Sequence, residues 1–214
     1  MNRDFTMRCC ALIAAFAILG TATAAEAKKE AKLPECSLTV SPKPGDSHVS
    51  KSGTSRLIQS GNTLGSNTGS KTITRSLKWG VETRFREDRP EKLELKAFYL
   101  GNNDKNKLIQ LGSETKTLTL DKNGRASIEL TSPTTRLTKS RTTSTSRHCG
   151  GSNGFRSTKT TTRGERVTGC VLQLYADGKL VKSWSSDSRW ANEAKNEAFS
   201  IENLNKSSRK IGLR

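Results

Sequence analysis

"KTITRSLKWGVETRF", residues 71–85, alternates apolar and polar side chains along its length, and this pattern decides the fold class. The apolar side chains all fall at odd positions, namely Ile73, Leu77, Trp79, Val81 and Phe85. Because successive side chains of a strand point to opposite faces, the pattern predicts a long strand with one buried face.

The segments that follow carry similar patterns and are separated by turns. "KLELKAFYL" (92–100) alternates again, and "DKNG" (121–124) and the Asp177-Gly178 pair in "VTGCVLQLYADGKLVKSW" (167–184) are hairpin signals. The connections look too short for the helix that a parallel crossover needs, so the chain is predicted to be all-β, an antiparallel sandwich of about seven strands. We expect its core to contain Ile73, Leu77, Trp79, Val81, Phe85, Leu93, Leu95, Val171 and Trp184.

The rest of the chain divides by composition. Residues 28–70 are predicted to be a charged leader, a first strand at "CSLTV" (36–40) and a Ser/Gly-rich loop. Residues 71–200 would form the sandwich. "DSRWANEAKNEAF" (187–199) has helical spacing, so a short C-terminal helix or tail is expected there, followed by a basic tail at 201–214.

The N-terminus has the three parts of a secretory signal peptide. Arg3 and Arg8 precede an apolar run, and small residues around Ala24 and Ala27 fit a cleavage site. The run is shorter than the about 20 residues that a spanning helix needs. Residues 1–27 are therefore predicted to be a signal peptide, which implies a periplasmic, outer-surface or secreted protein with no transmembrane anchor after cleavage.

The charge and one long segment indicate the kind of partner. The formal net charge is +17, which favours polyanionic partners, although Lys and Arg also coat ordinary solvated surfaces. Export disfavours nucleic acid as the physiological partner. Residues 132–166 are predicted to be a flexible basic loop with little to bury. The seven Lys and Arg of its stretch 134–163 are the candidate polyanion contacts: Arg136, Lys139, Arg141, Arg147, Arg156, Lys159 and Arg163.

Three cysteines follow residue 27, namely Cys36, Cys149 and Cys170. An exported chain can form disulfides, and three cysteines allow one bridge and one remaining thiol. The preferred pairing is Cys149 with Cys170, which would tie the long loop to the sheet. The alternative is Cys36 with Cys170.

Enzymatic and metal chemistry is poorly supported. His148 beside Cys149 lacks an orienting third partner, and these two residues with Cys36 and Cys170 lack the spacing of a zinc site. "CGGSNG" (149–154) has no phosphate-loop ending. We therefore expect no catalytic residues, no metal site and no cofactor.

The run "LKWGVETRFREDRPEKLELKAFYL" (77–100), with the later "GCVLQLYADGKLVKSW" (169–184), resembles the immunoglobulin-like sandwich modules of exported bacterial proteins. The resemblance implies an immunoglobulin-like β-sandwich and supplies no catalytic or ligand residues. It leads us to expect a secreted, non-enzymatic binding or structural module of the cell envelope, whose partner is an envelope or surface protein or an anionic glycan. One alternative is a basic binder of polyanions such as anionic glycan or lipopolysaccharide. A second is an extracellular glycan hydrolase or its accessory.

Overall fold

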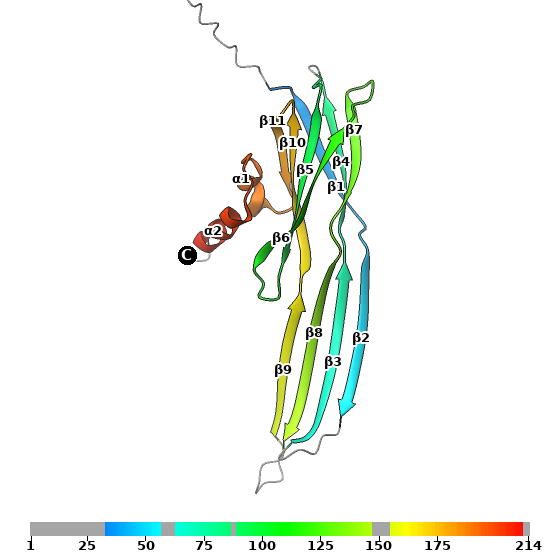
Figure 1. The fold of residues 1–214 in the computed structure, drawn as a ribbon, viewed down its shortest axis with the longest axis vertical. Helices are drawn as coiled ribbons and strands as arrows, with labels where there is room; N and C mark the ends of the chain where they lie inside the picture. The colour runs from blue at the N-terminus through cyan, green and yellow to red at the C-terminus, as the bar shows by residue number, and fades with distance from the viewer. Residues whose placement is uncertain (1–32, 57–62, 87–88, 147–154, 212–214) are drawn as a thin grey trace, which may run out of the picture. The chain divides into compact units, whose positions relative to one another are not determined.

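The computed structural model describes residues 33–56, 63–86, 89–146 and 155–211, all within the unit Leu33–Arg214. The predicted signal peptide lies outside the described residues. In the part described, the chain forms eleven strands and three short helical segments (Figure 1). The elements are β1 (Cys36–Lys43), β2 (Ser47–Arg56), β3 (Thr63–Arg75), β4 (Lys78–Phe85), β5 (Leu93–Asn102), β6 (Leu108–Leu118), β7 (Arg125–Thr131), β8 (Thr135–Ser146), β9 (Phe155–Gly164), β10 (Arg166–Ala176), β11 (Lys179–Ser185), η1 (Ser188–Trp190), α1 (Ala191–Ala194) and α2 (Ile201–Ile211).

Two of the three antiparallel sheets enclose the main core. Their strand orders are β1-β4-β7 and β11-β10-β5-β6. Apolar side chains of both sheets meet in one cluster, in which the rings of Trp79 on β4 and Tyr99 on β5 stack with centroids 5.9 Å apart. The prediction of an all-β antiparallel fold is confirmed. The expected number of about seven strands is too low, because four of the eleven described strands form a third sheet.

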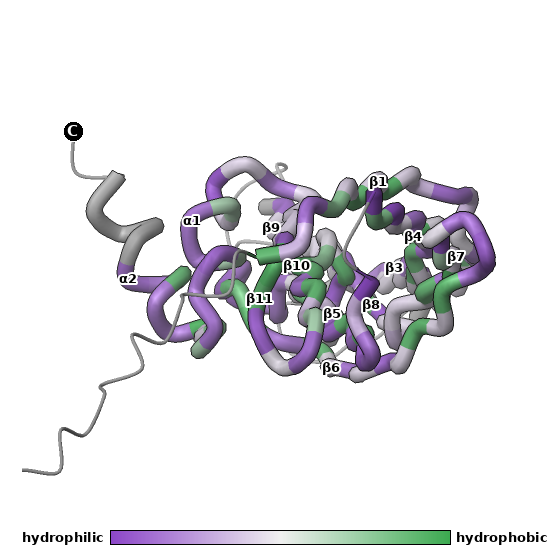
Figure 2. The backbone as a smooth tube through the Cα atoms, turned by 90° about the horizontal axis from the view of Figure 1, so that it is seen from above, coloured by the Kyte–Doolittle hydropathy of each residue, from purple (hydrophilic) through white to green (hydrophobic). Residues whose placement is uncertain are grey.

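Most of the predicted core residues are buried. Those buried are Trp79, Val81, Phe85, Leu93, Leu95 and Val171. Figure 2 shows the hydrophobic residues along the backbone in green. Leu77 and Trp184 are half-buried and pack against the core. Ile73 does not belong to it: this residue lies on β3 of the third sheet, opposite Val49 and Leu137.

The C-terminal segment covers the outer face of β5 and β10. Trp190, Ala194 and Leu204 form a second cluster with Leu100 and Val171. The predicted helix at 187–199 is only η1 and α1, whereas the predicted tail at 201–214 contains the longer helix α2 up to Ile211. The tail is helical because burial of Leu204 outweighs the weak helical signal of its polar sequence.

The segment at α1 is also held to the sheet by a buried amide. The side-chain amide of Gln173 on β10 donates to the carbonyl oxygens of Ala194 at 3.0 Å and Asn196 at 2.6 Å. Gln173 is fully buried, and these bonds satisfy its donor group.

The third sheet, with the order β2-β3-β8-β9, replaces two predicted loops. The supposed Ser/Gly-rich loop before residue 71 contains β2 and most of β3, and the supposed flexible loop at 132–166 contains β8 and β9. Both predictions were wrong because they judged these segments by what they could bury. Thr is a good strand former, and cross-strand hydroxyl pairs such as Ser52–Ser70 (2.7 Å) and Thr72–Thr138 (3.0 Å) join the neighbouring strands.

This sheet has no apolar face. Among the described side chains of its four strands, only Thr135 and Leu137 are buried, and both lie where the sheet meets the sandwich. Figure 1 shows the four strands side by side as a single layer. Its stability therefore depends on backbone pairing, cross-strand polar pairs and attachment to the sandwich.

Each strand of the polar sheet continues a strand of the sandwich. The breaks fall at residues 44–46, 76–77, 132–134 and 165, which we call the junction. Hydrogen bonds cross it: the backbone amide of Ser76 donates to the carbonyl of Asp46 at 2.9 Å, and that of Ser132 to the carbonyl of Leu77 at 2.9 Å. Buried hydroxyls add to them, because the Leu77 amide donates to Ser132 Oγ at 2.9 Å.

The Thr135 hydroxyl connects three strands at the junction. Its Oγ1 donates to the carbonyl of Arg75 on β3 at 3.1 Å and accepts from the amide of Val167 on β10 at 3.1 Å. Thr135 is only 5% exposed, so neither backbone group could turn to water if the hydroxyl were removed.

Replacing this hydroxyl should destabilise the protein. Thr135→Val keeps the shape and strand propensity of the side chain but leaves a buried amide and carbonyl unsatisfied. We expect a loss of about 1–3 kcal/mol, seen as a melting temperature lowered by about 3–10 °C. Thr160→Val, at an exposed position of β9, is the matched control and should change stability by less than about 0.5 kcal/mol. Equal effects of the two changes would show that the hydroxyl does not hold the junction.

Candidate functional site

The polar sheet presents two chemically different faces. Residues directly opposite each other in antiparallel strands point to the same face, so the register assigns every side chain. One row across the sheet contains Lys51, Lys71 and Lys139 in direct succession on β2, β3 and β8. We call this side the lysine face, and it also carries Arg75, Arg141 and Arg156.

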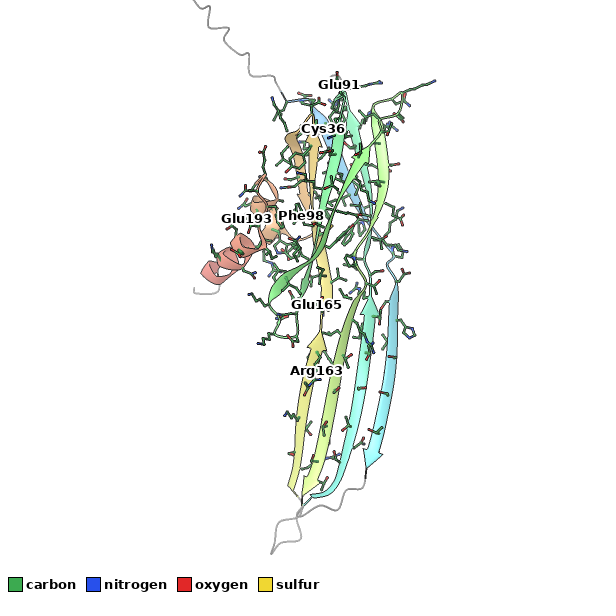
Figure 3. The ribbon with its side chains drawn as sticks, viewed as in Figure 1. Cys36, Glu91, Phe98, Arg163, Glu165 and Glu193 are labelled. Carbon is green, nitrogen blue, oxygen red and sulfur yellow. The ribbon has the colours of Figure 1, made fainter. Side chains whose placement is uncertain are left out.

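The opposite side, the hydroxyl face, carries rows of Ser and Thr. One row is Ser52, Ser70, Ser140 and Thr161, from β2 to β9. Its described basic side chains stand at the margins, with Lys159 and Arg163 on the outer strand β9 and Arg136 next to the junction. Figure 3 labels Arg163 on β9.

The structure brings together six of the seven predicted polyanion contacts on β8 and β9 but divides them between the faces. Lys139, Arg141 and Arg156 lie on the lysine face. Arg136, Lys159 and Arg163 lie on the hydroxyl face. Arg147 lies outside the described residues.

Sequence reasoning missed Lys51, Lys71 and Arg75, because it assigned β2 and residues 63–70 to a loop and residues 71–75 to a strand of the sandwich. The high content of Ser and Thr in these segments is the signal that could have found the strands, because Thr is a good strand former.

On β2 and β3, two glycines form a floor between the rows of the lysine face, and the same row continues to Arg141 on β8. Gly53 and Gly69 are paired directly, one step further from the junction than Lys51 and Lys71. A Cβ atom added to Gly69 would meet no atom within 4 Å, and one added to Gly53 would only approach the Thr68 carbonyl oxygen at 3.9 Å. Beyond the glycines lies an open hollow of about 420 Å³, lined by Asn67, Gly69, Arg141, Thr143, Arg156 and Thr158.

The four strands contain ten Lys and Arg and no Asp or Glu. The carboxylates closest in sequence are at the junction, where Asp46 pairs with Lys78 Nζ at 3.4 Å. Glu165 lies on the chain between β9 and β10 (Figure 3). The positive charges of the sheet are therefore not neutralised within the sheet, and they add to one another over a small area.

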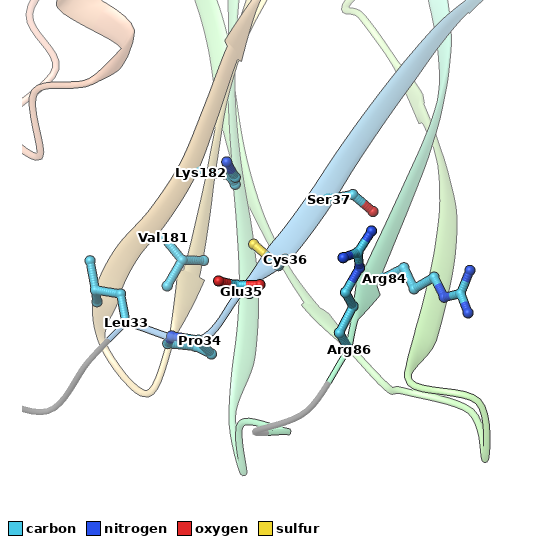
Figure 4. A pocket seen from close by; sticks show the side chains of 9 residues that line it. All are labelled: Leu33, Pro34, Glu35, Cys36, Ser37, Arg84, Arg86, Val181 and Lys182. Carbon is cyan, nitrogen blue, oxygen red and sulfur yellow. The ribbon is translucent and has the colours of Figure 1, made fainter.

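A second hollow, of about 550 Å³, lies at the start of β1. Figure 4 shows Cys36, Arg86 and Lys182 around it. Partial burial raises the pKa of the Cys36 thiol, and the charge of Lys182 offsets this only in part. The group is thus a neutral thiol near pH 7 and a poor nucleophile.

The alternative disulfide between Cys36 and Cys170 is not formed, since both are free thiols. Lys182, which lines the same hollow as Cys36, pairs with Leu174. Leu174 is four positions along β10 from Cys170, roughly 13 Å at the rise of a strand, whereas bridged Cα atoms lie within about 7 Å.

The preferred partner, Cys149, lies outside the described residues. Its pairing with Cys170 stays a prediction.

Catalytic and metal chemistry gains no support from the described part of the chain. His48 is exposed on β2, and His148 lies outside the described residues. No group of three His, Cys, Asp or Glu within the described ranges could hold a metal ion. Trp79 and Tyr99 are core residues and not a sugar-stacking platform.

A third hollow contains two carboxylates, Glu82 and Asp121. Asp121 accepts hydrogen bonds from the amides of Arg125 and Asn123, both at 2.8 Å, and these bonds lower the pKa of its carboxyl. The general acid of a glycoside hydrolase needs a raised pKa, so this pair does not favour the hydrolase alternative.

Comparison with known proteins identifies no relative from which a function could be inferred. No protein-family model and no curated protein sequence matches this chain. Of the helices described, none is long and apolar enough to cross a membrane.

The two described thiols should differ sharply in reactivity. Cys36 is half-buried at a hollow, whereas Cys170 is fully buried and burial raises the pKa of its thiol strongly. Prolonged alkylation of the native protein at a mildly alkaline pH, followed by peptide mapping, should modify Cys36, and should modify Cys170 only after a denaturant is added. A Cys170 peptide recovered in a disulfide from the native protein would contradict the structure.

Proposed function

We propose that the protein is an exported, non-enzymatic binding module of the cell envelope that holds anionic polymers on its polar sheet. The observation that carries the proposal is the composition of that sheet. Ten basic residues without one acid stand on four strands that have no apolar face. Such a surface attracts polyanions and releases their counterions on binding.

The single layer supports the same proposal. Neither face of the sheet has to pack on a core, so side chains on both sides remain free to meet a ligand. The sheet is anchored at the junction, which fixes the charges in a regular array before any ligand arrives. A preformed array loses less conformational entropy on binding than a flexible basic loop would.

The sandwich supports an immunoglobulin-like module. The sandwich has seven strands, β1, β4, β5, β6, β7, β10 and β11. Counted in chain order, the first, second and fifth (β1, β4, β7) form one sheet, and the seventh, sixth, third and fourth (β11, β10, β5, β6) form the other. The constant-type immunoglobulin fold has the same arrangement except for its fourth strand, which lies in the sheet of the first, second and fifth strands. Hairpins β2–β3 and β8–β9 are insertions in this scheme, as expected of a binding surface added to a scaffold.

Binding should depend on the sheet and not on total charge. Replacing the six described basic residues of β8 and β9 (Arg136, Lys139, Arg141, Arg156, Lys159 and Arg163) with Gln should weaken binding to heparin and polygalacturonate at least about 100-fold at low salt. The matched control replaces six exposed lysines outside the sheet, Lys105, Lys107, Lys122, Lys179, Lys195 and Lys206, and should retain most of the affinity.

Affinities are measured by calorimetry over a series of salt concentrations, with neutral dextran as a negative control. Binding should fall steeply as salt increases. Equal losses in the two six-residue variants, or no binding of the unmodified protein to either polymer, would overturn the proposal.

A further inference from the structure

We infer that the lysine face holds one extended chain of an acidic polysaccharide, in a groove that crosses the strands over Gly53 and Gly69. This inference rests on the proposed function and specifies its ligand, face and direction. It is carried by the register of the sheet, the two paired glycines and the different chemistry of the two rows that flank them.

The first wall of the groove is the row of Lys51, Lys71 and Lys139. These residues are direct cross-strand neighbours, so their Cα atoms follow one another at about 5 Å. A pyranose ring is about as long as this strand spacing, so a polymer with an acidic group on each sugar can present its charges to successive lysines. Three like charges side by side are unfavourable by themselves, and an anionic chain along the row removes that repulsion.

The fold does not require glycine at positions 53 and 69, whereas a ligand lying close to the backbone would. Glycine inside a strand weakens it and often marks the close approach of a ligand. Neither Gly53 nor Gly69 has a positive φ, and a Cβ atom would fit at both positions. This sets them apart from Gly45 and Gly164 at the junction, where an added Cβ would lie 2.2 Å and 2.1 Å from a carbonyl oxygen.

The second wall differs in chemistry from the first. The row beyond the glycines on the same face consists of Ser55, Asn67 and Thr143. It lies four residues along the strands from the lysine row, which is about 13 Å. Hydroxyl and amide side chains suit the hydroxyl groups of a sugar. In the adjoining hollow, Arg141 and Arg156 can each receive a carboxylate or sulfate with paired donors.

The face lacks what single-stranded nucleic acid requires. Binding of single strands relies on aromatic side chains that stack on the bases. The described side chains of the lysine face include no aromatic residue. Acidic polysaccharide therefore fits this surface better than nucleic acid does.

Variants that remove charge from one face at a time test which face of the polar sheet binds the polysaccharide. Lys51, Lys71 and Lys139 are changed together to Gln, and the matched control changes Arg136, Lys159 and Arg163 to Gln, which removes the same charge from the hydroxyl face. With polygalacturonate as the probe, we expect the lysine-face variant to bind about 30-fold or more weakly and its slope of log Kd against log salt to decrease by about two units. The control should lose less than about a third as much affinity.

Glycine variants test the groove without any change of charge. Gly53→Val with Gly69→Val fills the floor using a residue that strands favour, and should weaken polygalacturonate binding at least about 10-fold, because the chain is lifted away from the lysine row. Ser144→Val with Ser157→Val enlarges a cross-strand pair on the hydroxyl face and should bind as the unmodified protein does. Far-ultraviolet circular dichroism confirms that each variant keeps its strands.

The outcomes separate this inference from the proposed function. If the unmodified protein binds neither heparin nor polygalacturonate, both fail. If it binds but the two faces respond equally, or the filled groove binds normally, only the groove is refuted. Tighter binding of oligo-dT than of polygalacturonate, with the same dependence on Gly53 and Gly69, would overturn the assignment to polysaccharide.

Discussion

The junction between the sandwich and the polar sheet is the constraint on which the rest of the structure depends. A four-stranded sheet without an apolar face gains little from burial to offset the conformational entropy lost when its strands become ordered. It is ordered because four strands with a packed core continue directly into it, and because the buried hydroxyl of Thr135 joins β3, β8 and β10 at that point. The packed core therefore stabilises the polar sheet at its junction end, and backbone hydrogen bonds between the strands keep the rest of the sheet ordered.

That arrangement also determines the candidate site. Once the junction sets the register, Lys51, Lys71 and Lys139 fall in one row and Gly53 and Gly69 in the next. A shift of a single residue would send a strand's side chains to the opposite face and scatter the lysine row. A sheet without a core leaves the lysine face open to solvent, and the four strands contain no carboxylate that would neutralise its charges.

Sequence alone predicted the parts of the fold that burial controls. The alternation around Trp79, Val81 and Phe85 identified a strand and its core face, because apolar periodicity is a strong signal. The polar strands were missed for the converse reason: β8 and β9 consist mostly of Ser, Thr, Lys and Arg, which offer no hydrophobic contrast. The same reasoning misplaced Ile73 in the core, since its apolar side chain continues the pattern of β4 although the strand has already left the sandwich.

The candidate site was predictable in part. The basic residues of 134–163 were identified as contacts from charge alone, but their division between two faces needs the register, and Lys51 and Lys71 join Lys139 only after folding. The glycine pair has no signature in sequence, because Gly53 and Gly69 are ordinary in a segment that resembles a loop. Which residues share a face is set by pairing between strands distant in sequence.

Hydrogen–deuterium exchange of the backbone amides in β3 and β8 tests the central claim most directly. If the polar segments form a sheet, the amides of residues 66–74 and 136–144 exchange on the order of 100-fold or more slowly than in an unfolded chain, with protection decreasing away from the junction. Exchange at the unfolded rate throughout both segments, while β4 and β10 stay protected, would show that these residues are flexible loops and that the lysine face does not exist.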